Sequence, residues 1–305
     1  MGPALFDPRV QLRFRNCSRQ CRGLLTSPVH SESVARTRRW QASRELVNIG
    51  HRGASLHAPE NTLAAFDLAL SMGAHYLELD VHTTKDGHLV VFHDEDLDRV
   101  VRAPARAMGG LVSALTLSEL SDLDVGSWFS EIYAGTKMVT LEEVLARYRH
   151  CARLCIELKG RSSEDEPRRR LLSLLRRFEL VTEETGPGRV IVLSFEQPTL
   201  QALAEACPQL DLMLLFDCSD APDKITWGIR RAATFASCIG LHLEVVTAVV
   251  DEAHAHGLFV YPFTVNDPAD MLRLLAAGVD GMITDAPDRL DVVLRQMRQV
   301  AHLAS

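Results

Sequence analysis

The sequence predicts an α/β fold, a (β/α)8 TIM barrel with a small insertion in the second strand-helix connection. From residue 46 onward, short apolar runs alternate with amphipathic segments, which is typical of a parallel sheet built from strand-helix units. Eight such runs occur over about 250 residues, which favours a closed barrel over an open sheet. Polar residues end several runs, as they do at the carboxyl ends of strands in barrel enzymes.

The elements follow from apolar runs and helical periods along the chain. The predicted strands are Leu46–Gly50, Tyr76–His82, Leu154–Leu158, Val190–Phe195, Leu212–Phe216, Ile239–His242, Phe259–Phe263 and Gly281–Thr284. The predicted helices are Thr62–Met72, Leu141–His150, Arg168–Phe178, Thr199–Ala206, Thr247–Ala255, Ala269–Ala276 and Leu290–His302. Asp86-Gly87 lies between two apolar alternations, Leu79–His82 and His88–His93, and predicts a hairpin turn. The stretch from Asp94 to Lys137, with a short helix at Leu117–Leu123, predicts the insertion.

The amino-terminal segment differs from the rest of the chain. Residues 1–44 contain nine Arg, no Lys and two acids, a net charge of +7, whereas residues 45–305 contain 24 basic and 38 acidic residues, a net charge of −14. We therefore predict an Arg- and Ser-rich extension over 1–44, disordered or targeting, and a barrel over 45–305. A cytoplasmic protein is the first interpretation, and a mitochondrial-type presequence in 1–44 is the alternative.

Composition excludes several classes of protein. No uncharged apolar run reaches the length of about 18 residues that a membrane-spanning helix needs, so only peripheral membrane contact stays open. The acidic body argues against a nucleic-acid partner. Seven Cys without the spacing of a zinc or redox motif indicate reduced thiols in a reducing compartment. The sequence does not indicate an oligomeric state.

Chemistry-bearing residues gather where the predicted strands end. His51 and Arg52 follow the first strand, Glu78 and Asp80 lie in the second, and the hairpin ends in His93-Asp94. The third strand carries Glu157 and is followed by Lys159. Because side chains two residues apart on a strand point the same way, Glu78 and Asp80 share one face, and so do Glu157 and Lys159.

Three carboxylates inside strands that should be buried on both faces require compensation. A divalent cation held by Glu78, Asp80 and Glu157 is the simplest source, and an all-oxygen ligand set suits Mg or Ca better than Zn. The alternative is that Glu78 or Glu157 forms an internal salt bridge with Arg52 or Lys159. Beside such a metal, His51 and His93 would move protons while Arg52 and Lys159 neutralise phosphate oxygens, a set suited to phosphate ester chemistry.

The same residues stand in motifs that span about residues 46–290. Together these motifs resemble the glycerophosphodiester phosphodiesterase family: His51-Arg52-Gly53-Ala54-Ser55, Ala58-Pro59-Glu60-Asn61-Thr62, Leu77-Glu78-Leu79-Asp80-Val81, Thr84-Lys85-Asp86-Gly87, Phe92-His93-Asp94, Leu97-Asp98-Arg99, Ile156-Glu157-Leu158-Lys159 and Phe263-Thr264-Val265-Asn266.

The resemblance implies a TIM-barrel hydrolase of glycerol and lipid metabolism, which cleaves glycerophosphodiesters such as glycerophosphocholine and glycerophosphoethanolamine to glycerol 3-phosphate and an alcohol. It also implies a Mg or Ca ion on Glu78, Asp80 and Glu157. The paired catalytic His would be His51 and His93, and the phosphate-binding cations would be Arg52 and Lys159. The family's insertion would correspond to about residues 81–139. By analogy, the glycerol 2-hydroxyl is the nucleophile and forms a cyclic phosphate that water then opens.

Some positions depart from the family pattern or allow two interpretations. Phe263 stands where the family commonly has Trp, and we expect it to line the substrate pocket. Glu60 is expected either to contact glycerol or to support a residue that does. Asn61 and Thr62 are candidate caps of the first helix.

Two alternative functions remain at this stage. A lysophospholipase D would act on lysophospholipids and would need an apolar groove, for which the insertion offers Met108, Leu111, Leu115, Trp128, Phe129 and Ile132. A non-catalytic phosphate-binding module on the same fold is the second, since fold alone does not determine function.

Overall fold

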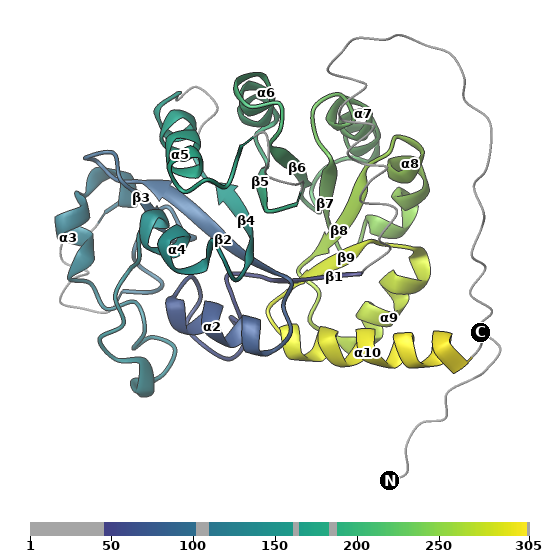
Figure 1. Ribbon diagram of the computed structural model, residues 1–305, viewed down its shortest axis with the longest axis horizontal. Coiled ribbons are helices and arrows are strands. Elements are labelled where there is room, and N and C mark those ends of the chain that lie inside the picture. Colours follow the sequence, from purple (N-terminus) through teal and green to yellow (C-terminus); the bar gives the residue numbers. More distant parts are fainter. Residues whose placement is uncertain (1–45, 102–109, 161–164, 183–187, 304–305) are drawn as a thin grey trace.

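The computed structural model describes residues 46–101, 110–160, 165–182 and 188–303. The extension predicted for residues 1–44 lies outside these ranges. Among the described residues, the molecule is a barrel of parallel strands surrounded by helices (Figure 1).

All eight predicted barrel strands are present, each within two residues of the predicted bounds. They are β1 (Val47–Gly50), β2 (Tyr76–Thr83), β4 (Arg153–Leu158), β5 (Val190–Ser194), β6 (Asp211–Phe216), β7 (Cys238–His242), β8 (Phe259–Phe263) and β9 (Gly281–Thr284). The order around the barrel is β8-β7-β6-β5-β4-β2-β1-β9. Two backbone hydrogen bonds between the β8 and β9 regions, Asp280 N–H to Val260 O (3.1 Å) and Val265 N–H to Ile283 O (3.0 Å), bring the ends of this order together. The prediction of a (β/α)8 TIM barrel is confirmed.

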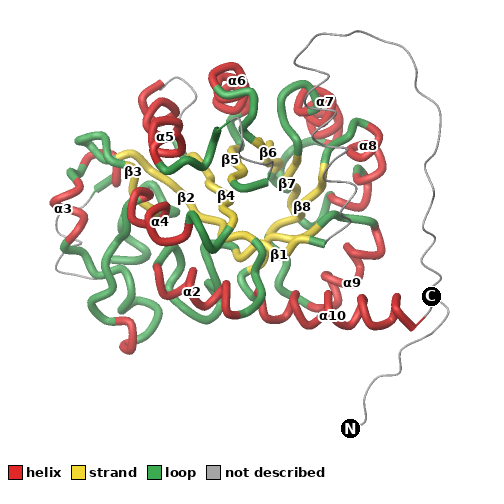
Figure 2. Tube along the Cα trace, viewed as in Figure 1, coloured by secondary structure: helices red, strands yellow, loops and turns green. Residues whose placement is uncertain are grey.

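A helix follows each barrel strand and packs on its outer side (Figure 2). Seven of these helices were predicted: α2 (Leu63–Ser71), α4 (Leu141–Tyr148), α5 (Asp165–Arg177), α6 (Gln197–Ala206), α8 (Val250–Ala255, after the 3-10 turn η4 at Val246–Ala248), α9 (Pro268–Ala277) and α10 (Pro287–Leu303). The eighth, α7 (Pro222–Ala232), fits the expected alternation of strands and helices, but the sequence analysis gave it no range. Its buried residues, Ile225, Gly228, Ile229 and Ala232, have helical spacing, but a glycine at one of the four core positions weakened the apolar signal. None of the described helices combines the length and the apolar character needed to cross a membrane.

The two faces of the strands are buried against different partners. On β2, Leu77, Leu79 and Val81 face the helices and belong to the large core between barrel and helices. Tyr76, at the start of the same strand, belongs to a second core inside the barrel, together with Cys155 of β4. The two-residue period therefore directs the side chains that follow Tyr76 and Cys155 at even spacing to the barrel interior, at its carboxyl end.

The connection from β2 to α4 holds the predicted insertion. It begins with the hairpin to β3 (Leu89–Val91), in register Val81 to Val91, and continues through η2 (Val112–Ala114), α3 (Leu117–Ser121) and η3 (Glu131–Tyr133). Asp86-Gly87 lies in the loop of this hairpin, and Gly87 has a φ of 81°. The insertion has a core of its own, built from residues such as Val90, Leu97, Val112, Leu120 and Val125.

Candidate active site

A cavity of about 230 Å³ opens at the carboxyl ends of the barrel strands. Seven of the nine site residues predicted from the sequence line it, and the two that do not are Asp80, which is fully buried, and Glu60. The lining residues are His51, Arg52, Glu78, His93, Glu157, Lys159, Leu193, Phe195, Leu215, Phe263, Thr264 and Ile283.

The three predicted carboxylates meet at one end of this cavity. Glu78 and Asp80 project from β2 and Glu157 projects from β4, where Asp80 and Glu157 are direct partners in the strand register. Each offers an oxygen within 4.8 Å of the others, and all three residues are buried. The parallel register thus brings acids 79 residues apart in the chain into one cluster.

Two cations lie among these acids. Lys159 Nζ is 2.6 Å from Glu157 Oε1 and 2.9 Å from Asp80 Oδ1, and Arg52 Nε is 3.2 Å from Asp80 Oδ2. The internal salt bridges considered from the sequence are therefore present for Glu157, although they extend to Asp80 as well. In the described part of the chain, no cationic side chain forms an ion pair with Glu78, which accepts a backbone hydrogen bond from the Arg52 N–H at 2.7 Å.

Arg52 and Lys159 do not fully compensate the negative charge of the three buried carboxylates. Burial, together with the charges of Asp80 and Glu157, holds the pKa of Glu78 well above its usual value. Burial and the charge of Asp80 raise the pKa of Glu157 to about 7. Although burial opposes it, the charges of Lys159 and Arg52 hold the pKa of Asp80 below its usual value.

The cluster has the properties of a site for a divalent cation. Asp80 Oδ1 is buried and has no hydrogen bond of good geometry, despite its short distance to Lys159, so a lone pair remains available. A divalent cation would supply positive charge beside Glu78, which has no cationic partner among the described residues, and beside Glu157, whose partner Lys159 is shared with Asp80. Three carboxylates are a ligand set for Mg or Ca. The residues present therefore fit such an ion.

A strained turn after β1 positions Arg52. Arg52 has a φ of 55° and Gly53 a φ of 87°, both in the left-handed region. A Cβ on Gly53 would lie 2.6 Å from the carbonyl carbon of Ala65 in α2, so only glycine fits. This turn directs the Arg52 N–H at Glu78 and the Arg52 side chain at Asp80, and such strain is typical of functional sites.

Each predicted catalytic histidine forms a short pair with an aspartate. His51 Nδ1 lies 2.6 Å from Asp285 Oδ1, and His93 Nδ1 lies 2.6 Å from Asp94 Oδ1. Since an ionised carboxylate only accepts hydrogen bonds, Nδ1 of each ring carries the proton and donates it. Nε2 of each ring is then left for other partners.

Neighbouring groups shift the pKa of Asp285 and of His93. Although burial acts against it, the hydrogen bonds from His51, Asn266 and Ser55 lower the pKa of Asp285 to about 2. Burial and the positive charges of Arg52 and Lys159 hold the pKa of His93 below its usual value, against the effect of Asp80. A lower pKa keeps His93 neutral near pH 7, as a proton acceptor must be.

The residues before α2 have different roles from one another. Thr62 caps the helix, because its side chain accepts a hydrogen bond from Ala65 N–H. Asn61 does not cap the helix. It has a φ of 57°, donates from Nδ2 to Asp80 Oδ2 at 2.9 Å and accepts from the Asp80 N–H at 3.3 Å. It therefore orients a predicted metal ligand, a role that the sequence analysis missed.

Glu60 contacts two arginines. Its Oε1 accepts from Arg52 at 3.0 Å, and both of its oxygens accept from Arg99, at 2.7 and 2.9 Å. Of the two expectations for Glu60, these contacts favour the support of another residue over direct contact with glycerol.

The wall of the cavity away from the acids is aromatic. Phe263, at the end of β8, lies edge-to-face with Phe195, with ring centroids 6.0 Å apart. His242 approaches Phe263 in the same manner, at 6.4 Å. Phe195 remains 44% exposed, so this wall presents an apolar edge to anything that enters the cavity.

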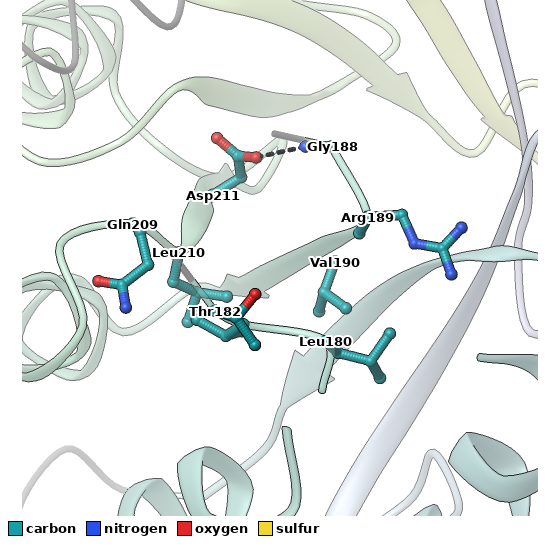
Figure 3. A pocket seen from close by; sticks show the side chains of 9 residues that line it. Leu180, Thr182, Gly188, Arg189, Val190, Gln209, Leu210 and Asp211 are labelled. Atoms are coloured by element: carbon teal, nitrogen blue, oxygen red, sulfur yellow. Dashed lines mark hydrogen bonds between the residues drawn. The ribbon is translucent and has the colours of Figure 1, made fainter. Parts of the chain in front are cut away.

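A second cavity, at the amino ends of β5 and β6, measures only about 10 Å³ (Figure 3). It lies between Leu180, Val190 and Leu210, and Asp211 accepts the Gly188 N–H beside it at 2.7 Å. This volume is at the lower limit for one water molecule, so it offers no substrate site.

Several residues of the site were given no role in catalysis or binding from the sequence. Asp285 directly follows β9 and Asp94 lies three residues after the end of β3, so polar residues close to strand ends could have been examined for both. Arg99 and Asn61 lie in loops, and nothing in their local sequence indicates which side chains they contact.

Comparison with known proteins agrees with the fold and the site described above. Residues 51–289 match the sequence profile of the Glycerophosphoryl diester phosphodiesterase family. The chain is similar to the glycerophosphodiester phosphodiesterase of Bacillus subtilis, with 34% identity over 275 residues, 87% of this chain and 92% of that protein. The enzyme of the same name from Caldanaerobacter subterraneus is 35% identical over 250 residues, 81% of this chain and 97% of that protein.

Solved structures agree. A phosphodiesterase of Oleispira antarctica, solved in complex with the product sn-glycerol-3-phosphate, has a TM-score of 0.70 and 28% identity, over 83% of this chain and 98% of that chain. The glycerophosphodiester phosphodiesterase of Agrobacterium tumefaciens has a TM-score of 0.66 and 29% identity, over 80% of this chain and 98% of that chain.

Proposed function

The chain belongs to the glycerophosphoryl diester phosphodiesterase family and is a phosphoric diester hydrolase, and from this premise we propose that it cleaves glycerophosphodiesters such as glycerophosphocholine and glycerophosphoethanolamine to glycerol 3-phosphate and an alcohol. One observation carries the proposal. Two histidines line the same cavity as two cations and a carboxylate cluster, and Nδ1 of each histidine is hydrogen-bonded to an aspartate. The glycerol 3-phosphate bound to the Oleispira relative supports the choice of product.

His51 and His93 are the proposed acid and base. With Nδ1 engaged by Asp285 or Asp94, each ring has Nε2 left for the substrate. One ring takes the proton of the nucleophile, and the other gives a proton to the departing alcohol oxygen. By analogy with the family, the nucleophile is the glycerol 2-hydroxyl, and the two rings exchange roles when water opens the cyclic phosphate.

Arg52 and Lys159 are the proposed phosphate-binding residues. Both line the cavity, and their pairing with acids keeps them charged, since the charges of Asp80 and its neighbours raise the pKa of each cation despite burial. They would hold the non-bridging oxygens as negative charge develops. A Mg or Ca ion held by Glu78, Asp80 and Glu157 would supply Lewis-acid stabilisation of the same oxygens.

Phe263 and Phe195 support the glycerophosphodiester class over larger phosphodiesters. A cavity of about 230 Å³ with one apolar wall suits a small molecule that has a charged phosphate and a carbon backbone. Phe263 would contact the carbon atoms while the cations hold the phosphate.

The lysophospholipase D alternative finds less support. Of the residues that it requires for a groove, Leu115 is buried and Trp128 packs on the insertion's own core. Leu111 and Ile132 remain exposed, at 49% and 82%. Met108 lies outside the described residues.

A substrate panel tests the proposal. Purified protein with added Mg or Ca should release glycerol 3-phosphate from glycerophosphocholine and glycerophosphoethanolamine, and excess EDTA should abolish the release. Turnover of lysophosphatidylcholine in place of glycerophosphocholine would favour the lysophospholipase D alternative. An analogue without the glycerol 2-hydroxyl should be resistant, and its normal hydrolysis would exclude the cyclic route.

A further inference from the structure

The two histidine–aspartate pairs are held in place by different kinds of residue. Asp285 accepts hydrogen bonds from the neutral side chains of Ser55 (2.8 Å) and Asn266 (2.7 Å) in addition to His51. Asp94, in the other pair, receives a charged donor instead, since Arg99 Nε lies 2.6 Å from Asp94 Oδ2. Arg99 thus takes the place beside His93 that Ser55 and Asn266 share beside His51.

The other end of the Arg99 guanidinium is also engaged. Its two terminal nitrogens donate to the two oxygens of Glu60, at 2.9 and 2.7 Å. Glu60 in turn accepts from Arg52 at 3.0 Å. A single side chain therefore connects the partner of His93 to the partner of Arg52, two residues proposed to act on the same phosphate.

The insertion contributes a third contact. The Arg99 guanidinium lies 5.4 Å from the ring centroid of Trp128, within the range of a cation–π contact. Trp128 is fixed by a hydrogen bond from its Nε1 to Val125 O at 2.9 Å and packs against the insertion's core. The insertion thereby restricts the orientations open to the Arg99 fork.

We propose that Arg99 is a positioning residue of the hydrolytic reaction, which holds Asp94 against His93 and Glu60 against Arg52 and is itself oriented by Trp128 of the insertion. The inference rests on the proposed function of His93 and Arg52. The planar guanidinium can hold two carboxylates in a fixed relative orientation, whereas the single ammonium of lysine cannot.

A role in positioning differs from a role in stability. The Arg99 side chain is 42% exposed, and ion pairs of that exposure contribute little to folding. Loss of Arg99 should therefore lower kcat strongly and leave the melting temperature almost unchanged. Loss of a residue with a merely structural role would lower the melting temperature and leave kcat almost unchanged.

The first test is the kinetics of Arg99→Ala. We expect kcat to fall on the order of 10-fold to 100-fold, with a smaller change in KM and little change in melting temperature. Guanidinium ion added at millimolar concentration should restore part of the lost kcat. Arg99→Lys should recover little, because the donors of an ammonium all sit on one nitrogen and cannot reproduce the planar fork that faces both carboxylates.

Arg147 provides a matched control. It donates to Asp67 through two nitrogens, at 2.7 and 3.3 Å, lies over the ring of Tyr148 at 5.6 Å, and is away from the cavity lining. Arg147→Ala should keep wild-type kcat. Wild-type kcat in Arg99→Ala, or equal losses in the two variants, would overturn the proposal. If Arg99→Ala does not fold, Arg99→Lys and Trp128→Leu replace it, and unchanged kcat in both would have the same meaning.

The second test does not depend on activity. In protein labelled with ¹⁵N-histidine and free of substrate, the Nδ1 protons of His51 and His93 should both resonate downfield because each donates to a carboxylate. Arg99→Ala should shift or broaden the His93 signal and leave the His51 signal in place, since Asp285 does not contact Arg99. An unchanged His93 signal overturns the positioning role. If the wild type cleaves no glycerophosphodiester, the proposed function fails separately, and the spectra still decide the position of Asp94.

Discussion

At the scale of the residue, the site depends on a few side chains whose surroundings change their protonation. The three acids are buried close to one another and, within the described ranges, share only two cations, and each histidine has one nitrogen paired with an aspartate. The same residue types elsewhere on the surface lack this combination. His57, for example, pairs with Asp288 at 3.0 Å but does not line the cavity.

Replacement of either cavity histidine should slow turnover strongly. We expect His51→Ala and His93→Ala each to lower kcat on the order of 10²-fold or more, because each removes one proton transfer. His57→Ala, which also breaks a histidine–aspartate pair, should retain wild-type kcat. Steady-state kinetics with glycerophosphocholine measures all three. Near-full activity in either cavity variant would remove that histidine from the mechanism.

The carboxylate cluster should destabilise the folded protein when no metal ion is bound. In the presence of chelator at about pH 8, Glu78→Gln should be more stable than wild type by about 1 kcal/mol or more, a rise of roughly 2–4 °C in Tm. The reason is that burial and like charge hold the pKa of Glu78 well above its usual value, so its ionisation destabilises the fold as pH rises. Gln keeps an oxygen for the Arg52 N–H.

Added Mg or Ca should reverse this order. The ion should raise the Tm of the wild type, since a ligand that binds only the folded state stabilises it, and should raise that of Glu78→Gln much less. Glu244→Gln, an exposed acid, should behave as wild type throughout. Equal responses of wild type and Glu78→Gln to both ions would argue against Glu78 as a ligand. Thermal unfolding monitored by circular dichroism provides the measurement.

At the scale of the element, the sequence predicted eight strands, each followed by a helix, and gave ranges for seven of those helices. Strands buried on both faces are continuous apolar runs, and this made them easy to recognise. Helix α7 was missed because Gly228 interrupts its apolar stripe, yet the side chain of Phe216 requires that gap, since a Cβ on Gly228 would lie 2.4 Å from it. A tertiary contact thus selected a residue that weakens the local helix signal.

The turn between β1 and α2 should tolerate no side chain at Gly53. Gly53→Ala combines a left-handed φ with a Cβ 2.6 Å from the backbone of Ala65, and we expect a loss of about 3 kcal/mol or more in the free energy of unfolding. Gly135→Ala, at a φ of +80° with nothing within 4 Å, should lose only about 1–2 kcal/mol from backbone strain. Urea denaturation compares the two. Similar losses in both variants would mean that the contact with α2 contributes nothing.

The contact between α8 and the start of β9 should make stability depend on pH. The hydrogen bond from His254 to Asp280, at 2.9 Å, raises the pKa of His254 above 6.5, although burial acts in the other direction. The stabilisation is therefore complete below about pH 6.5 and is lost as the pH rises through the raised pKa. The difference in unfolding free energy between wild type and His254→Gln should be larger at about pH 5.5 than at about pH 8.5.

His256, an exposed histidine that caps the same helix, provides the comparison. His256→Gln should show a much smaller dependence on pH over the same range. A difference for His254→Gln that stays constant or grows with pH would contradict the pairing with Asp280.

At the scale of the whole molecule, we propose that the hydrolase is a single barrel over residues 45–305 with a separate extension. The family match begins at residue 51 and the first strand at Val47. Removal of residues 1–44 should therefore leave kcat and Tm at wild-type values, and a marked fall in either would assign the extension to the barrel. A fluorescent protein fused behind residues 1–44 tests whether this segment directs the protein to an organelle. A diffuse cytosolic signal supports the cytoplasmic prediction, and an organellar signal supports the presequence.

The sequence by itself predicted the barrel, nine candidate site residues and the end of the barrel at which they meet, and seven of the nine line the cavity. Apolar runs mark the strands, and the two-residue period places Glu78 with Asp80, and Glu157 with Lys159, on one face of each strand. The structure then showed that these faces are the inner ones. Parallel strands bring their carboxyl ends to one end of the barrel, so the sequence also predicted that these side chains meet there.

Only the tertiary structure decided which residues support that site. Asp285 is 234 positions from His51, and Glu60 is 39 positions from Arg99, so no local pattern records either contact. Such pairings depend on how the barrel closes and on the side-chain rotamers that packing then permits. For the same reason Trp128, which the sequence offered as part of a lipid groove, packs on the core of the insertion and lies beside Arg99.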